Sequence, residues 1–325
     1  MEKIKFLTMA ALATAFFASC SNEDGLPQSN YPADNVVRIT TSVDGMNTRA
    51  SYGGSTAKLS SFGFCINNAG SDKYTYDNIK VTQENGKWNP ATQMLWQNST
   101  TAVDILAYAP YQANGNVKIF GKSDYAFSVK EDQSIAEDYS SDLIVYKQTG
   151  FKPESDLNTN QAVNVAFTHL LSQLNLTIEL RDQFNQDEEK PVTEATVTDV
   201  KVNGTIISSK VDFSASPISV QVDDTQEATA ITPETTEFKA AGKTTDHAAF
   251  NYSAIVIPQT VTAGNFSISF KVDGTDYIWT STSDANFVSG NKHQLSLLVG
   301  KDVVQVKGIT ATPWGKENIT QGETD

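Results

Sequence analysis

The sequence predicts an all-β protein made of two tandem β-sandwich domains. Apolar and polar residues alternate with a period of two in many short runs along the 325 residues. These runs are rich in Val, Ile, Thr, Phe and Tyr, and Gly, Asn, Asp and Pro separate them. Helical periodicity is weak. Many short strands with turns between them favour sandwiches over a βαβ sheet, and the chain length suggests two domains.

The first predicted strand is 36–43, where Val37, Ile39, Thr41 and Val43 face one way. Similar alternation predicts further strands in order at 61–66, 103–108, 142–146, 174–180, 196–202, 218–222, 253–257, 266–272, 294–299 and 303–309. Asn-Gly at 85–86, 114–115 and 203–204 and Asp-Gly at 273–274 predict hairpin turns. A short helical turn is expected at 167–173. There, Phe167, Leu170, Leu171 and Leu174 could face the core.

The first nineteen residues have the three parts of a secretory signal. Lys3 and Lys5 precede an apolar run at 6–17, which is too short for a stable membrane helix. Small residues then lead into Cys20, whose thiol could be acylated after cleavage. We therefore expect a signal peptide at 1–19, an acylated tether at 20–35, and membrane attachment only through the lipid.

The formal net charge is −14, which argues against nucleic acid or an anionic membrane face as a partner. If Cys20 carries the lipid, Cys65 has no disulfide partner and is expected to be a buried, inert thiol. The polar segment 152–161 interrupts the strand pattern. It predicts domains at 36–160 and 161–325.

The sequence shows no recognisable catalytic apparatus, and we expect neither a cofactor nor a metal. Gly242-Lys243-Thr244 resembles the end of a phosphate loop but lacks its first glycine. The acidic clusters at 187–189 and 223–224 lack an ordered loop of calcium ligands. The remaining candidates are far apart or lie in strands, which favours structural roles: His169, His247, His293, Trp88, Trp96, Trp279 and Trp314.

Several segments in order resemble the fimbrillin family, the lipoprotein-derived subunits of Bacteroidales type V pili. They are Asn47-Thr48-Arg49-Ala50, Gly86-Lys87-Trp88, Leu95-Trp96, 103–111, 142–146, 167–174, 287–290 and Pro313-Trp314. The acidic stretch 21–25 after Cys20 is similar to the signal that exports Bacteroidetes lipoproteins to the outer face of the outer membrane. The resemblance implies two transthyretin-like sandwiches and localisation to a surface fimbrium.

The resemblance also implies a mechanism of assembly. A trypsin-like protease cuts such pilins after an arginine and removes the first strand, and a strand of the next subunit fills the groove. The cut here would fall between Arg49 and Ala50 and would free 36–43. Arg38 is a poorer site because backbone pairing would hide it. The expected partners are other fimbrial subunits, with host or microbial surface ligands as further candidates.

Several alternatives stay open. Family donors come from the C-terminal end, but the tail after Trp314 is short and polar; the strands 294–299 and 303–309 could instead be donors or belong to the chain's own second domain. Shaft, tip, anchor and accessory positions are all compatible. The alternative function is a stand-alone surface lipoprotein that binds glycan or a host protein. A hydrolase would need clustered carboxylates or a His-assisted nucleophile. For His169 we expect a bond to a neighbouring backbone group at the domain junction.

Overall fold

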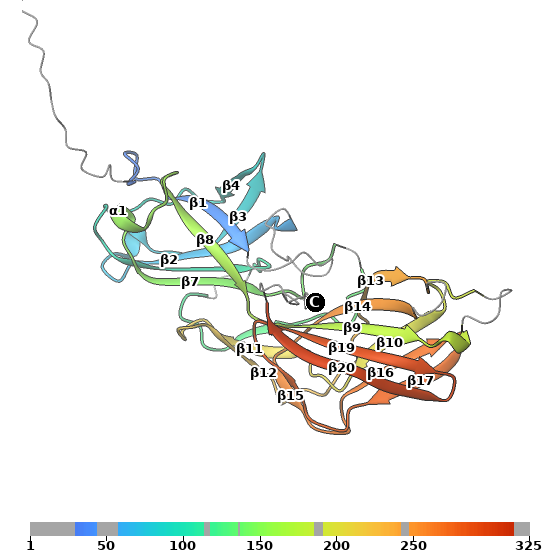
Figure 1. Ribbon diagram of the computed structural model, residues 1–325. Helices are drawn as coiled ribbons and strands as arrows, with labels where there is room; N and C mark the ends of the chain where they lie inside the picture. Colours follow the sequence, from blue (N-terminus) through green and yellow to red (C-terminus); the bar gives the residue numbers. More distant parts are fainter. Residues whose placement is uncertain are drawn as a thin grey trace, which may run out of the picture.

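The computed structural model describes residues 30–43, 58–113, 118–135, 137–184, 191–241 and 247–314. Nearly all regular structure in these residues is β-strand, and the helical elements are short: α1 (Pro153–Asp156) and the 3-10 turns Asp72–Tyr74 and Asp182–Phe184. No described helix has the length and hydropathy of a membrane span. Figure 1 shows two lobes that lie side by side, with the strand β8 running from one toward the other. The all-β fold is confirmed.

The N-terminal lobe is a single seven-stranded sheet. Its order is β1-β8-β7-β5-β2-β3-β4, so β1 and β4 are its edges. Alternate buried residues on β2 and β5 line opposite faces of this sheet, and one face forms a core of its own. The strands are β1 (Arg38–Val43), β2 (Ser61–Asn67), β3 (Tyr76–Glu84), β4 (Lys87–Pro90), β5 (Val103–Ala109), β7 (Ile144–Phe151) and β8 (Ala162–His169).

The C-terminal lobe contains a five-stranded sheet, β13-β14-β9-β19-β20, and a three-stranded sheet, β10-β16-β17. Buried apolar residues from both sheets share one cluster, as expected for a sandwich. The bounds are β9 (Ser172–Leu180), β10 (Val197–Asn203), β13 (Glu234–Lys239), β14 (Ala248–Val256), β16 (Ser267–Val272), β17 (Thr275–Thr280), β19 (Asn291–Gly300) and β20 (Val303–Pro313), and a small pair consists of β15 (Gln259–Val261) and β18 (Ala285–Phe287).

A second three-stranded sheet connects the two halves of the chain. It has the order β12-β11-β6, in which β6 (Tyr125–Ser128) lies between β5 and β7 in sequence, whereas β11 (Ser208–Asp212) and β12 (Ser219–Val222) come from the C-terminal half. The Lys147 ammonium of β7 donates hydrogen bonds to the carbonyls of Phe213, Ser214 and Ala215 at 2.7–2.9 Å. The two lobes are therefore joined by strand pairing as well as by the chain itself.

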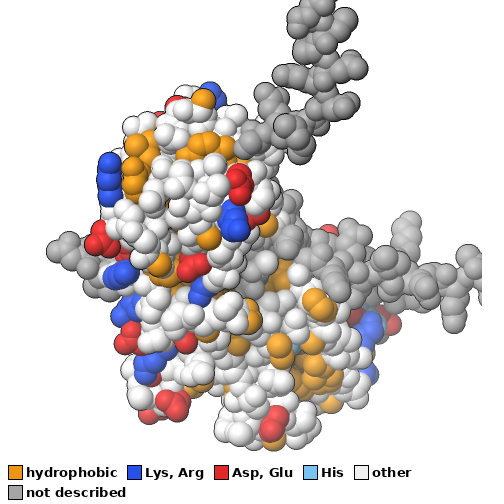
Figure 2. Space-filling model, turned by 90° about the vertical axis from the view of Figure 1, so that its left-hand side faces the viewer, with side chains coloured by type: hydrophobic (Ala, Val, Ile, Leu, Met, Phe, Trp, Pro, Cys, Tyr) orange, Lys and Arg blue, Asp and Glu red, His pale blue; other side chains and the backbone are white. Residues whose placement is uncertain are grey.

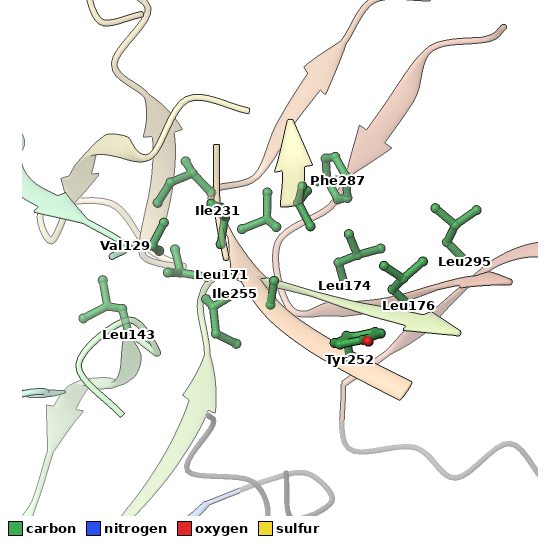
Figure 3. Packing of buried hydrophobic residues seen from close by; sticks show 14 of the residues in the cluster. Val129, Leu143, Leu171, Leu174, Leu176, Ile231, Tyr252, Ile255, Phe287 and Leu295 are labelled. Carbon is green, nitrogen blue, oxygen red and sulfur yellow. The ribbon is translucent and has the colours of Figure 1, made fainter. Parts of the chain in front are cut away.

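The hydrophobic cluster of the C-terminal lobe continues across the junction. Figure 3 shows Val129 and Leu143 of the N-terminal half close to Leu171 and Ile255, and the same cluster extends to Leu176. These side chains are at most 2% exposed. Because the buried residues are contiguous, we expect the lobes to unfold together.

All eleven strands predicted by alternation coincide with observed strands, within a few residues at each end. Two of the predicted hairpin turns are also confirmed: Asn85-Gly86 joins β3 to β4, and Asp273-Gly274 joins β16 to β17. The third predicted hairpin turn within the described residues is wrong, because Asn203-Gly204 links β10 to β11, which lie in different sheets. The pair at 114–115 lies outside the described residues.

The predicted helical turn at 167–173 is also wrong. Residues 162–169 form β8 and 172–180 form β9, with only Leu170 and Leu171 between them. The four apolar residues that suggested a helix are buried because the two strands lie in different sheets with cores on both sides. The division into domains 36–160 and 161–325 stays a prediction, but the sheets extend across it: β8 belongs to the N-terminal sheet, and β6 pairs with β11.

Candidate functional site

The first strand, β1, is attached to the fold by one ladder. It pairs in parallel with β8 along its whole length, from Arg38 opposite Ala162 to Val43 opposite Phe167. No described strand pairs with its other edge. Just before β1, the Val37 N–H donates to the Met94 carbonyl at 3.0 Å. β1 is thus a peripheral strand with a free row of backbone groups.

Alternate side chains from Val37 through β1 fill apolar sites in the N-terminal core. Val37, Ile39 and Val43 are 2%, 7% and 7% exposed, and they belong to the same cluster as Phe62 and Phe167. Burial of one such side chain contributes about 1.5–3 kcal/mol. Removal of β1 would therefore expose both an unpaired edge of β8 and a row of vacant apolar sites.

A groove of about 800 Å³ runs along β1 on the side of the hairpin β3–β4. Half-buried Trp88 lies in it, packed edge-on against Phe62 with ring centroids 5.0 Å apart. The lining contains two basic side chains and several amides but no acidic one: Arg38, Lys87, Gln83, Asn89 and Asn160. The groove therefore differs in charge from the strongly acidic chain around it.

An exposed ion pair holds the start of β1. The Arg38 guanidinium donates to both carboxylate oxygens of Asp34, at 3.0 and 2.6 Å. This bond and a second from the Val36 N–H lower the pKa of Asp34 from 3.8 to about 2. A lowered folded-state pKa stabilises the fold above pH 3.8, and that stabilisation is lost as the pH falls through about 2. The pair is exposed, so its effect on stability is small and depends on salt.

We expect NMR titration to give Asp34 a pKa of about 2 in the wild-type protein and a value closer to 3.8 in Arg38→Gln, because the largest cause of the shift is removed. Asp124 is the matched control. Its pKa is lowered by Lys122, and it should titrate identically in both proteins. An Asp34 pKa that does not change in Arg38→Gln would contradict the assigned pairing.

The predicted lipidation residue Cys20 and the predicted processing residues Arg49 and Ala50 lie outside the described residues. β1 ends at Val43, and the structure describes the chain again from residue 58. Arg38, the poorer candidate for cleavage, is paired with Ala162 within β1. The motif at 242–244 and the acidic cluster at 187–189 are also outside the described ranges.

The last described strand, β20, is an edge strand like β1. It pairs only with β19, in antiparallel register from Val303 opposite Gly300 to Pro313 opposite Asn291. Val303, Val306 and Ile309 are 42%, 42% and 58% exposed. Trp314, directly after the strand, is 8% exposed and is the only buried residue in 303–314.

Trp314 packs at the junction of the lobes against His169, the last residue of β8. The two rings are stacked, with centroids 3.8 Å apart and planes 4° apart. His169 Nδ1 lies 2.9 Å from Asp142 Oδ1, and both side chains are at most 1% exposed. A carboxylate only accepts, so Nδ1 carries the proton. The expected junction role of His169 agrees with this position, but its partner is a carboxylate rather than a backbone group.

Sequence reasoning missed Asp142 as a functional candidate, because it counted only as the start of a predicted strand and of one segment of the family resemblance. The Lys292 ammonium lies 5.8 Å from the Trp314 ring centroid, and burial lowers the pKa of Lys292. No local pattern could bring residues 142, 169, 292 and 314 together, since long-range strand order decides their proximity.

The other singled-out residues have structural surroundings. His247 lies 3.3 Å from Asp182, and buried His293 accepts a hydrogen bond from the Val288 N–H at 3.1 Å. In the part of the chain that the structure describes, no three His, Cys, Asp or Glu side chains are close enough to hold a metal ion. Burial raises the pKa of the Cys65 thiol well above its usual range. Trp96 stacks on Phe151, and Asp223 pairs with Lys210.

The sequence model of the fimbrillin-like family matches residues 48–314, which is most of the chain. The chain belongs to the fimbrillin-like family. The match begins after β1 and ends at Trp314, so it covers every other strand of the fold. Comparison with curated proteins gives no match.

Solved structures share the fold of this fimbrillin-like chain. A putative cell adhesion protein from Bacteroides ovatus has a TM-score of 0.60 at 12% identity, with 87% of this chain and 99% of that chain covered. One from Bacteroides uniformis has a TM-score of 0.54 at 18% identity, with 86% and 100% covered. A fimbrial protein from Bacteroides vulgatus has a TM-score of 0.51 at 15% identity, with 85% and 99% covered.

Proposed function

We propose that this fimbrillin-like protein is a structural or adhesive subunit of cell-surface fimbriae, assembled by β-strand exchange after removal of its N-terminal strand. The observation that carries the proposal is the attachment of β1. It is an edge strand with a single ladder to β8, and its apolar side chains fill sites in the N-terminal core. Another chain could satisfy the same backbone groups and the same sites.

The position of Arg49-Ala50 supports removal of β1. The bond follows β1 in the sequence and precedes β2, so one cut there separates the strand from the rest of the chain without breaking another described strand. A basic residue within a described strand, such as Arg38, is protected from cleavage by the backbone pairing of that strand. We further propose that Cys20 is acylated and tethers the precursor to the outer membrane at the cell surface.

The donor in this proposal is the C-terminal strand β20. It is an edge strand, eleven residues long, and carries apolar side chains that its own sandwich leaves exposed. One face of β20 lies beside the row of buried side chains of β19. This face carries Val304, Val306 and Ile309. These features suit a strand that exchanges its partners.

The proposed function requires no catalysis.

The surface also suits this function. Figure 2 shows acidic, basic and hydrophobic side chains interspersed on the face that it presents, without a large patch of one charge. Such a surface suits packing between protein subunits better than capture of a polyanion.

The test is limited trypsin digestion of the soluble form, residues 21–325, followed by mass analysis of the new N-terminus and sizing of the product. We expect one early cut between Arg49 and Ala50, after which strand-linked oligomers form. Arg49→Gln is the matched control and should stay intact and monomeric. A wild-type chain that resists cutting there, or that is cut and stays monomeric, would contradict assembly by strand exchange.

The groove beside β1 favours the alternative, a stand-alone surface lipoprotein that binds glycan or a host protein. Trp88 offers an aromatic surface, and basic and amide side chains surround it. Glycan-array binding by the uncut chain that is lost in Trp88→Ala, with the fold retained, would support this alternative. Oligomers after cutting, without such binding, would favour the fimbrial subunit.

A further inference from the structure

The two edge strands β1 and β20 belong to different lobes, yet both depend on the strand β8. β1 pairs with residues 162–167 of β8, one partner for each of its six residues. The other neighbour, β7, pairs with β8 only at His169 and Thr168. Over residues 162–167, β1 is therefore the only ladder partner of β8 in the described structure.

The end of β8 is the surface on which β20 is anchored. Two residues after Phe167, which pairs with Val43, the His169 ring stacks on Trp314 at 3.8 Å. Its bond to Asp142 at 2.9 Å sets the orientation of the imidazole. The position of Trp314 thus depends on the end of β8, to which β1 is attached.

The backbone around Trp314 depends on the same junction. The Trp314 N–H donates to the Gly290 carbonyl at 2.7 Å, and the Gly290 N–H donates to the Leu171 carbonyl at 2.9 Å. The Ser289 hydroxyl donates to the Leu170 carbonyl at 2.5 Å. Leu170 and Leu171 are the two residues that join β8 to β9, so the end of β20 is attached to the connection that directly follows β8.

We propose that β1 locks the end of β20 through β8 and His169, so that loss of β1 loosens Trp314 and frees the C-terminal end of β20. The rest of β20 has little side-chain burial to retain it, because Trp314 is the only buried residue in 303–314. The use of this lock in assembly rests on the function proposed above, where it would delay strand donation until β1 is removed. The coupling itself is a property of the fold and can be tested without cutting the chain.

The experiment is hydrogen–deuterium exchange of the full chain, with mass analysis of peptides from β8 and β20. Ile39→Ala weakens β1 in place, because it removes a side chain that is 7% exposed in the N-terminal core. We expect exchange of both β8 and the end of β20 to rise about tenfold, the order of one lost buried aromatic contact. Faster exchange in β8 with unchanged β20 would overturn the coupling.

Ile66→Ala is the matched control. Ile66 lies on β2 in the same apolar cluster and is 1% exposed, but β2 pairs with β3 and β5 and not with β1 or β8. It should leave exchange of β20 unchanged, and an equal rise would mean general destabilisation and would overturn the proposal. If Ile39→Ala does not fold, Val43→Ala makes a smaller change in the same strand and is measured in the same way.

Trp314→Ala tests the lock itself. It should raise exchange of β20 without affecting β8, and Ile39→Ala added to it should produce no further rise in β20, since the contact is already lost. Additive effects in the double variant would overturn the proposed route. A chain that shows the coupling but forms no oligomers after cutting would contradict only the proposed function, whereas oligomers without coupling would contradict only the lock.

Discussion

Phe213→Ala is expected to lower the free energy of unfolding by about 3–5 kcal/mol, the range for truncation of a buried phenylalanine. Phe213 is fully buried directly after β11, and its ring lies 5.6 Å from that of Tyr108 on β5 and 5.1 Å from that of Tyr125 on β6. The three aromatic rings fill the space between the seven-stranded sheet and the sheet β12-β11-β6. Alanine would leave a cavity between the two sheets. The sheets cannot move together to fill it, because strand pairing holds each of them in place.

Urea unfolding followed by far-UV circular dichroism and by tryptophan fluorescence measures this effect. Because the cluster crosses the lobe junction, both signals should show one shared transition that moves to lower urea. Phe184→Ala is the matched control. Phe184 is only partly buried at the margin of the same cluster and should cost about 1 kcal/mol or less. An equal decrease in the free energy of unfolding in both variants would show that the aromatic contact between the sheets contributes no more to stability than a partly buried ring at the margin of the cluster.

His169→Ala is expected to lower the free energy of unfolding by about 2–4 kcal/mol. The substitution removes a hydrogen bond to the buried Asp142 carboxylate, for which about 1.5–3 kcal/mol is typical, and the stacked contact with Trp314, for which about 0.5–1.5 kcal/mol is typical. The effect should appear first as loss of the near-UV signal of Trp314, because this contact sets the packing of that ring.

His247→Ala is the control for His169. Its side chain is 25% exposed and lies 3.3 Å from an exposed carboxylate, so its loss should cost less than about 1 kcal/mol. Trp314→Phe keeps an aromatic ring on His169 and should recover part of the stability that Trp314→Ala loses. Unchanged melting of His169→Ala with loss of adhesion would reverse this view and would assign His169 to ligand binding.

The eleven strands with clear alternation were predictable because burial on one face imposes a period of two on any strand, whatever its neighbours are. The missed strands lack this signal for physical reasons. β4 is four residues long and only partly buried, and β8 is separated by only two leucines from β9, which was predicted. Packing on both sides of that connection made its apolar spacing look helical.

For the site, the sequence identified some of the members but not their arrangement. The strand at the N-terminus, the arginine after it and His169 were all singled out from local pattern or family resemblance. Asp142 and Lys292 were not, because a buried carboxylate and a half-buried lysine have no local signature when their partners are distant in the chain. The groove between β1 and the β3–β4 hairpin was missed for the same reason, since it lies between the two edges of one curved sheet.

The sequence by itself determined the all-β class, most of the strands, two hairpins and the resemblance to fimbrillins, because alternation, turn chemistry and short motifs are local properties. Only the tertiary structure decided that β1 and β20 are edge strands, that β6 joins a sheet of the other half, and that Trp314 stacks on His169. Strand order depends on which apolar faces can be buried together, and that is a property of the whole chain rather than of any segment.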